Sequence, residues 1–429
     1  MEAVTMERKL LRFTPGEYYD FEKEEVARRK GQIEGSVEFH DMRPPMPPRP
    51  LPEEMIIDYN KRWDKYNPLY TDPEYARAHG HKSVPAYPLL MVGAGADVDP
   101  FPKTFADGFY QTNDGSDVYY SRNLYAGDIL DVRKREGVKD DFYEFTKPGS
   151  AIRKWRMGGW RDRYDQNGEL VFKCYGSVTE AYKKYAVDSS EFDISENFAE
   201  WTKTMAPAHY TTDADYDRIK ALWAREVITG DDTPYWEDVN IGDEIAPTCT
   251  DGPVTYMHAN YWHQIGDISI FTREELSDPN EMKKYYRDQY GQYLDETALH
   301  FGNRNIDGAR SYWFNDTGAK LVARTLTNFV GNKGRVSRFS WKMFPYAPQL
   351  QDEILGADMF NKVSFMKGRY VDRHGSEGDT CIGRAVITDK YINEKGEHCC
   401  EMATWGESLD GNIIIACPSE VVLPSKNDK

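Results

Sequence analysis

The same series of motifs occurs twice along the chain, in the same order and with similar spacing. Each series runs from a polar loop to an apolar helix candidate, then to an acidic turn and a hairpin signal. In the first half these features occupy residues 66–72, 87–96, 125–130 and 165–170. In the second half they occupy residues 296–300, 318–330, 350–355 and 393–397. A repeat of this length indicates a duplicated domain rather than a solenoid. We therefore expect one domain over residues 1–230 and another over residues 231–429.

The helix candidate of the second half predicts how each domain is built. Its apolar side chains fall on one broad helical face that suits burial, and they are Leu321, Val322, Leu326, Phe329 and Val330. Long strand candidates separated by glycine-rich turns follow, for example residues 171–181 and 383–391. One helix with a run of strands favours an α+β domain, in which an antiparallel sheet wraps around the helix. A turn-rich linker at residues 231–234 separates the halves.

Composition and charge limit the partners of the chain. Its 429 residues carry a net charge of −17, with a globular balance of 40% hydrophobic and 29% charged residues. Because so acidic a surface repels phosphate backbones, no nucleic-acid partner is expected. The uncharged stretch at residues 83–96 is too short to cross a bilayer, so no membrane partner is expected. The six cysteines form no CxxC pair and no signal peptide is recognised, which predicts a cytoplasmic location.

One pair of side chains in the second half suits acid/base chemistry. Asp295 stands five residues before His300, and a loop with that spacing can bring a carboxylate and an imidazole onto one water molecule. The carboxylate accepts a hydrogen bond, and the imidazole can move a proton at neutral pH. Taken alone, such a pair is more often part of a solvated loop.

The residues around this pair resemble the signature of the MaoC-like enoyl-CoA hydratases and dehydratases, which is Asp-x-Asn-Pro-Leu-His. Asp295, Leu299 and His300 fit that signature. Thr297 and Ala298 stand where the signature has Asn and Pro, which changes how the loop would hold water and substrate.

The resemblance extends over roughly residues 40–425, and residues 67–77 resemble the N-terminal dehydratase domain of the same proteins. It implies two tandem hot-dog domains and the reversible hydration of a 2-enoyl thioester, with coenzyme A as the expected carrier. Asp295 and His300 would be the catalytic pair. A backbone N–H near Gly318, at the start of the central helix, would hold the thioester oxygen as negative charge develops there.

The first half differs from the second at the corresponding positions. Tyr70 takes the position of the histidine and Lys65 that of the aspartate, and both side chains have an ordinary pKa near 10. Neither is a competent base near neutral pH, so the resemblance implies that this half shapes the acyl-chain site. Asp64 is one residue out of register and receives no role. We expect Tyr70, together with Thr297 and Gly318, to contact the substrate.

Three further groups of residues are considered as candidate sites. A basic stretch that includes Arg335 and Arg338 would hold coenzyme A phosphates, or it forms a solvated hairpin. His79 and His81 lack a nearby third ligand, which disfavours a metal site. The charged residues 272–292 form either a lid or a solvated helix.

Two other functions share this fold and remain open. A hot-dog thioesterase would act on the same substrate class, and a non-catalytic thioester-binding subunit would result if the changes at Thr297 and Ala298 disable the loop. For the hydratase reading, no metal or other cofactor is required. We expect a homo-oligomer, a dimer or larger.

Overall fold

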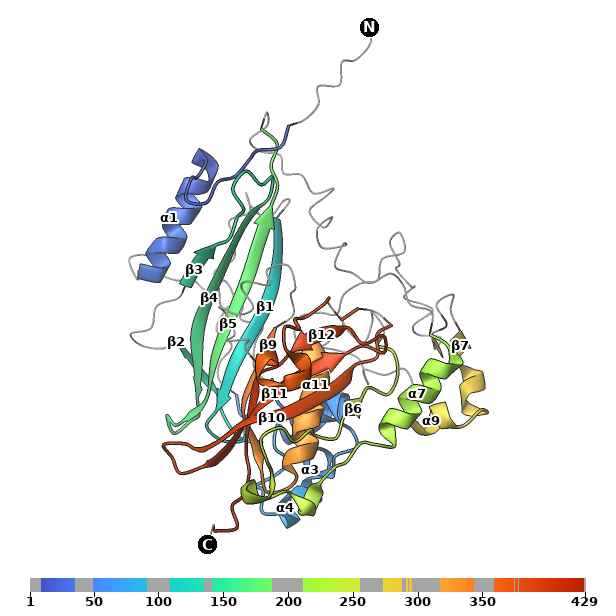
Figure 1. The fold of residues 1–429 in the computed structure, drawn as a ribbon. Helices are drawn as coiled ribbons and strands as arrows, with labels where there is room; N and C mark the ends of the chain where they lie inside the picture. Colours follow the sequence, from blue (N-terminus) through green and yellow to red (C-terminus); the bar gives the residue numbers. More distant parts are fainter. Residues whose placement is uncertain are drawn as a thin grey trace.

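The structure is a computed structural model of the chain. It describes residues 9–34, 49–90, 109–134, 141–186, 211–254, 273–287, 291, 293–294, 317–342, 359–373, 375–376 and 378–427. Within these residues the strands form one large sheet, and a small two-stranded hairpin lies to one side of it (Figure 1).

All strand pairs of the large sheet are antiparallel, in the order β2-β4-β5-β1-β9-β12-β11-β10-β6. In addition, β3 pairs with β4, and β13 pairs with β11 and β9. The strands are β1 (Phe109–Tyr120), β2 (Asp131–Lys134), β3 (Asp141–Glu144), β4 (Arg153–Tyr164), β5 (Leu170–Tyr182), β6 (Thr248–Cys249), β9 (Arg335–Lys342), β10 (Ile382–Ile392), β11 (His398–Glu407), β12 (Ile413–Ala416) and β13 (Ser419–Val422). The hairpin is β7 (Tyr286–Arg287) with β8 (Tyr293–Leu294).

A seam between β1 and β9 joins the strands of the first half to those of the second. It runs from Gly115 opposite Lys342 to Tyr119 opposite Arg338. Strands β1 to β5 lie on one side of this seam, and β6 with β9 to β13 lie on the other (Figure 1). The predicted α+β class, with antiparallel strands around a central helix, is confirmed.

The central helix packs against the second-half strands, and the other helices lie around the sheet (Figure 1). They are α1 (Asp20–Glu34), α2 (Glu53–Trp63), α3 (Pro68–Thr71), α4 (Pro73–Ala78), α7 (Asp213–Trp223), α9 (Arg273–Ser277) and α11 (Thr317–Val330). Short 3-10 turns are η1 (Gly230–Asp232), η2 (Trp236–Asp238), η3 (Glu281–Lys284), η4 (Phe360–Lys362) and η5 (Ser364–Met366). In the part of the chain that the structure describes, no helix is both long and apolar enough to span a membrane.

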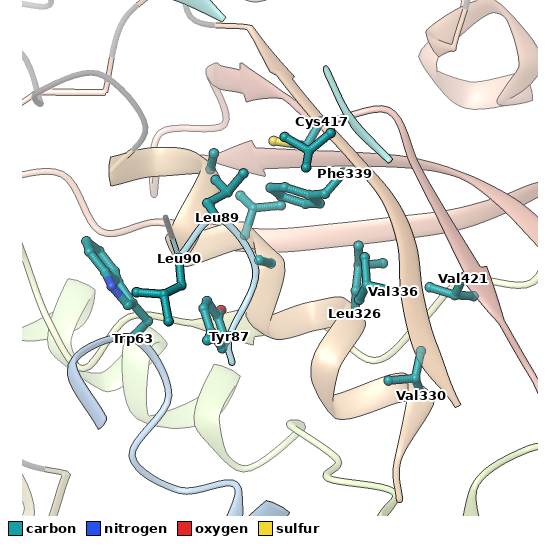
Figure 2. Packing of buried hydrophobic residues seen from close by; sticks show 14 of the residues in the cluster. Trp63, Tyr87, Leu89, Leu90, Leu326, Val330, Val336, Phe339, Cys417 and Val421 are labelled. Atoms are coloured by element: carbon teal, nitrogen blue, oxygen red, sulfur yellow. The ribbon is translucent and has the colours of Figure 1, made fainter. Parts of the chain in front are cut away.

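Helix α11 confirms the helix predicted at residues 318–330, and all of its residues are buried. Its apolar face packs against the second-half strands, where Leu326 and Val330 lie near Val336 and Val421 (Figure 2). Gly383 of β10 allows the helix to come this close to the sheet. A Cβ at that position would collide with the side chains of Thr325 on the helix and Thr248 on β6.

The opposite face of α11 is buried as well, although it is polar. Its polar residues are Lys320, Arg324, Thr327 and Asn328. Segments of the first half cover them: the Lys320 ammonium lies 5.0 Å from the centre of the Trp63 ring, and the Asn67 side-chain amide donates to Asn328 Oδ1 at 3.3 Å. Because buried polar groups need hydrogen-bonding or electrostatic partners, this helix is complete only when the first half is in place.

Local signals in the sequence explain where the elements begin and turn. The Asn67 side chain caps α3 by accepting from Leu69 N at 3.1 Å, and Pro68 opens that helix. The two predicted hairpin turns, at residues 165–170 and 393–397, join β4 to β5 and β10 to β11. The helix candidate at residues 87–96 is described only as far as residue 90, where the chain forms a turn.

Truncation of a side chain at the centre of α11 should destabilise the fold. Leu326→Ala should lower the free energy of unfolding by about 2–5 kcal/mol, because the side chain is fully buried and its removal leaves a cavity. Val227→Ala is the control, since Val227 is 51% exposed and its truncation should change stability by less than about 0.5 kcal/mol. Denaturant unfolding followed by circular dichroism measures both, and similar losses for the two variants would contradict the central place of α11.

Candidate functional site

The predicted catalytic residues Asp295 and His300 lie outside the described residues, as does Thr297. The structure describes the elements on either side of them: β8 ends at Leu294, and α11 begins at Thr317. The described part of the candidate site therefore consists of what surrounds the motif, namely the start of α11, the loop of the first half and the linker.

Gly318 is the second residue of α11 and is buried. The N–H groups in the first turn of a helix have no partner within the helix, and the helix dipole favours negative charge at this end. The first half contacts the same turn, because the Tyr87 hydroxyl donates to the carbonyl of Lys320 at 2.7 Å. The role of Gly318 as a donor to substrate stays a prediction.

The first-half loop is held in shape by the buried amide of Asn60. Its nitrogen donates to the carbonyls of Tyr70 and Pro85, both at 2.8 Å, and its oxygen accepts from the N–H of Tyr87 at 2.8 Å. The rings of Tyr70 and Tyr87 then meet edge to face, with centroids 5.8 Å apart. Burial raises the pKa of Tyr70 far above its usual range, so the hydroxyl stays protonated at neutral pH.

Two further residues of this loop reach Asp251 in the second half. The Lys65 ammonium lies 3.3 Å from Asp251 Oδ2, and the Tyr66 hydroxyl donates to the same oxygen at 2.9 Å. The Arg273 guanidinium lies 4.3 Å from the centre of the Tyr66 ring and donates from Nε to Asp251 Oδ1 at 2.9 Å. The loop is therefore tied to the second half by charge as well as by packing.

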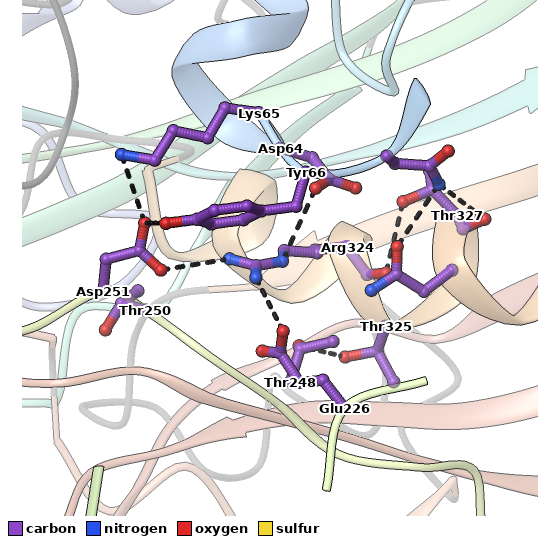
Figure 3. A network of polar contacts seen from close by, with 12 residues as sticks. Asp64, Lys65, Tyr66, Glu226, Thr248, Thr250, Asp251, Arg324, Thr325 and Thr327 are labelled. Atoms are coloured by element: carbon purple, nitrogen blue, oxygen red, sulfur yellow. Dashed lines mark hydrogen bonds and ion pairs between the residues drawn. The ribbon is translucent and has the colours of Figure 1, made fainter. Parts of the chain in front are cut away.

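Arg324 of α11 stands at the centre of these contacts (Figure 3). Its guanidinium donates to Glu226 Oε2 at 2.7 Å and lies 3.7 Å from Asp64 Oδ1 and 3.8 Å from Asp251 Oδ1. Burial acts to lower the pKa of Arg324, but the charges of the three carboxylates outweigh it and raise that pKa. The guanidinium is thus a fixed positive charge between the first-half loop, the segment just before the linker and the second half.

Asp64 is the least well partnered of the three carboxylates. Its oxygens have no side-chain hydrogen-bond partner among the described residues, and only the backbone N–H groups of Tyr66 and Asn67 lower its pKa by hydrogen bonding. Burial raises the pKa of Asp64 to about 6, and the nearby Arg324 charge offsets only part of that rise. Burial also acts to raise the pKa of Asp251. There, however, the charges of Arg324, Arg273 and Lys65 outweigh burial and hold that pKa below its usual range.

Sequence reasoning missed this network, although one signal pointed to it. Asp64 received no role because it is one residue out of register with Asp295. However, Lys320 and Arg324 interrupt a helix that was predicted to be buried. Buried cations are rarely left without partners. The cations therefore required carboxylates from elsewhere, but their spacing in sequence does not identify which ones.

The two arginines proposed to hold coenzyme A phosphates lie on β9 and are paired within the protein. Arg335 contacts the Glu397 carboxylate and donates to the carbonyl of Tyr120 at 3.1 Å. Arg338 lies 3.5 Å from Asp117 Oδ1, with its guanidinium 5.1 Å from the centre of the Tyr119 ring. Phosphate binding by either residue stays a prediction, and it would have to compete with these contacts.

His79 and His81 of the first half are engaged in hydrogen bonds. His79 Nδ1 lies 2.8 Å from the carbonyl of Tyr75, and its Nε2 lies 3.1 Å from Asp231 Oδ1 in the linker. His81 Nε2 lies 2.9 Å from the carbonyl of Asn332, just after α11. Over the described ranges, no cluster of three or more His, Cys, Asp or Glu side chains is arranged to hold a metal ion.

Comparison with known proteins gives matches only among solved structures. No family model matches the chain, and no curated protein matches it. A structure described as a MaoC-like dehydratase is 15% identical, with 88% of this chain and 96% of the other aligned and a TM-score of 0.45. A conserved hypothetical protein from Mycobacterium tuberculosis, described as having a double hotdog fold, is 13% identical, with 90% and 97% aligned and a TM-score of 0.43.

A third structure, the 12:0-ACP thioesterase from Umbellularia californica, is 9% identical, with 77% of this chain and 79% of that chain aligned and a TM-score of 0.27. The first two alignments each cover about nine-tenths of this chain. At these identities and TM-scores, the similarities favour no particular reaction or substrate.

The raised pKa of Asp64 should make stability depend on pH. The folded protein holds the Asp64 proton more tightly than the unfolded chain does, so ionisation of Asp64 destabilises the fold as the pH rises from about 4 to about 7. Asp64→Asn removes this contribution. The stability of the variant relative to the parent should therefore improve by about 3 kcal/mol over that range, as measured by urea unfolding at a series of pH values.

Asp251→Asn is the matched control from the same network. The pKa of Asp251 is lowered, so its stabilising contribution is present above the ordinary aspartate pKa and is lost only as the pH falls below it. The difference between Asp251→Asn and the parent should therefore be flat from pH 4 to pH 7. A flat difference for Asp64→Asn would contradict the interpretation of Asp64.

Proposed function

We propose that this chain catalyses the reversible addition of water to a 2-enoyl thioester, with coenzyme A as the carrier. Asp295 and His300 are the proposed acid/base pair. The protein would work in the cytoplasm as a homo-oligomer. The burial of all six cysteines as free thiols supports a reducing location.

The observation that carries the proposal is the place of the motif between two described elements. Strand β8 ends immediately before Asp295, and the helix that begins at Thr317 is wholly buried between the second-half sheet and the first half. A loop that leads into a buried helix can present a carboxylate and an imidazole beside the N-terminal turn of that helix. Such an arrangement brings a base, a proton carrier and N–H donors to one place, as hydration of a thioester requires.

The proposed chemistry assigns each group one task. Asp295 and His300 hold the water and accept its proton while the hydroxyl adds to C3 of the substrate. The thioester oxygen then carries enolate charge, which N–H groups near Gly318 stabilise. The proton is delivered to C2, and dehydration follows the same steps in reverse.

The contacts of the first-half loop support a division of labour between the halves. Lys65, at the aspartate position, is in an ion pair with Asp251, and Tyr70, at the histidine position, is a buried phenol with a raised pKa. Neither side chain is available as a base near neutral pH. Acid/base chemistry therefore falls to the second half, and the first half supplies a wall of the site.

Loss of either catalytic group should abolish most of the activity. Asp295→Asn and His300→Ala should each lower kcat by about two to four orders of magnitude, which is typical for removal of a positioned acid or base. The parent and both variants would be incubated with a panel of 2-enoyl and 3-hydroxyacyl thioesters, and the mass change of one water would be followed. Near-native rates in both variants would place the chemistry elsewhere.

The same assay separates the other two functions. Release of free thiol without a change of one water would identify a thioesterase. Binding of the thioesters without turnover by the parent protein would identify a non-catalytic subunit.

Tyr70→Phe tests the division of labour. The substitution keeps the ring that packs against Tyr87 and removes only the hydroxyl. We expect kcat to stay within about twofold of the parent value and any effect to appear in KM, which is the sign of lost uniform binding. Steady-state kinetics on the best thioester measures both constants. A hundredfold fall in kcat with KM unchanged would show that the first half takes part in the chemistry.

A further inference from the structure

A small side unit precedes the proposed catalytic motif and packs beside the large sheet (Figure 1). We define it as α7, α9, η3 and the β7–β8 hairpin. Residues 272–292, for which the sequence suggests either a lid or a solvated helix, contribute α9, η3 and β7 in their described part. The buried residues that hold the unit to the sheet are Tyr216, Ile219, Trp223, Cys249, Leu276, Ile382 and Leu409.

The side unit is anchored at its beginning to the Arg324 network. Arg273, the first residue of α9, donates to Glu226 Oε2 at 2.6 Å and to Asp251 Oδ1 at 2.9 Å. The same two oxygens face the Arg324 guanidinium, at 2.7 Å and 3.8 Å. The position of α9 is therefore tied to the central helix of the second half.

The end of the side unit is fixed by Arg287 of β7. Its guanidinium donates to Asp213 Oδ1 at 2.7 Å, to the carbonyl of Thr211 at 3.0 Å and to the carbonyl of Gly291 at 3.0 Å. The first two partners lie at the start of α7, and the third lies in the hairpin itself. One side chain thus joins both ends of the hairpin turn to helix α7.

Tyr216 of α7 holds the second strand of the hairpin directly. The N–H of Tyr293 donates to the Tyr216 hydroxyl at 3.3 Å, and the two rings lie 5.1 Å apart. In sequence, Asp295 follows β8 without an intervening residue. The Tyr216 hydroxyl therefore fixes the backbone two residues before the proposed catalytic carboxylate.

We infer that Tyr216 and Arg287 are positioning residues that hold strand β8, which leads directly into the motif with Asp295. The inference rests on the proposed function, because it concerns the placement of that motif. The route runs from Arg324 on the central helix through Glu226 and Arg273 to the side unit, and then along β8 to the motif. Displacement of a reacting group by about 1 Å can lower the rate about a hundredfold. Loss of this anchoring should therefore lower kcat.

The test uses Tyr216→Phe, Arg287→Met and Arg287→Lys in the full chain. Tyr216→Phe keeps the packed ring and removes the acceptor of the Tyr293 N–H, and we expect kcat to fall about tenfold with KM within about twofold. Arg287→Met should lower kcat about a hundredfold. Arg287→Lys should have a kcat between those of Arg287→Met and the parent, because it keeps a positive charge opposite Asp213. Lys284→Met is the control, since Lys284 lies on η3 of the same unit and its ion pair is a local one with Glu281.

A second measurement separates this inference from the proposed function. Hydrogen–deuterium exchange of the peptide that contains β8 and Asp295 should become faster in Tyr216→Phe and Arg287→Met, while exchange in α11 and the melting temperature stay at the parent values. Faster local exchange in a protein that lacks hydratase activity would retain the anchoring and overturn the proposed function. Unchanged kcat and unchanged exchange in both variants would overturn the inference. A fall in melting temperature that matches the loss of activity would also overturn it, because the residues would then be merely structural.

Discussion

The burial of the Arg324 guanidinium constrains the rest of this molecule. A charge on a helix with no exposed face has to be compensated, because removal of an ion from water costs several kcal/mol even after the protein relaxes. The compensation comes from Asp64 in the first-half loop, Glu226 shortly before the linker and Asp251 in the second half. Segments on both sides of the linker must therefore meet at one side chain before the central helix is stable.

The same requirement explains why the first half keeps the shape of a motif loop that carries no acid/base pair. Residues of this loop connect the first half to the second. Asp64 lies near Arg324, and Lys65 and Tyr66 contact Asp251. The Asn67 amide donates a hydrogen bond to Asn328. Removal of one member of a buried ion pair typically costs about 3–5 kcal/mol, because the other member is left without compensation. Structural use of these positions therefore resists further change.

Elements with strong local signals were predictable from sequence, and partners across the fold were not. The apolar face of α11 follows from helical periodicity, and the hairpins at residues 165–170 and 393–397 follow from their turn residues. The polar face of α11 depends on what covers it, which periodicity does not specify. Asp64 illustrates why partners across the fold were not predictable. Alignment of the two halves places Asp64 one residue out of register with Asp295, but in the structure it follows the end of α2 and faces Arg324. The roles of Asp295 and His300 come from sequence alone, because both lie outside the described residues.

The β1–β9 seam has a consequence for how the chain folds. It pairs residues on the order of 200 positions apart, such as Tyr119 with Arg338. Contacts of such high contact order form slowly, because a long loop must close before any ladder hydrogen bond is gained. During synthesis, β1 would already have emerged while the segment that forms β9 is still unmade, which leaves one edge of the first-half sheet open. An open edge can recruit strands from other chains, so the nascent first half is exposed to aggregation until β9 has been made.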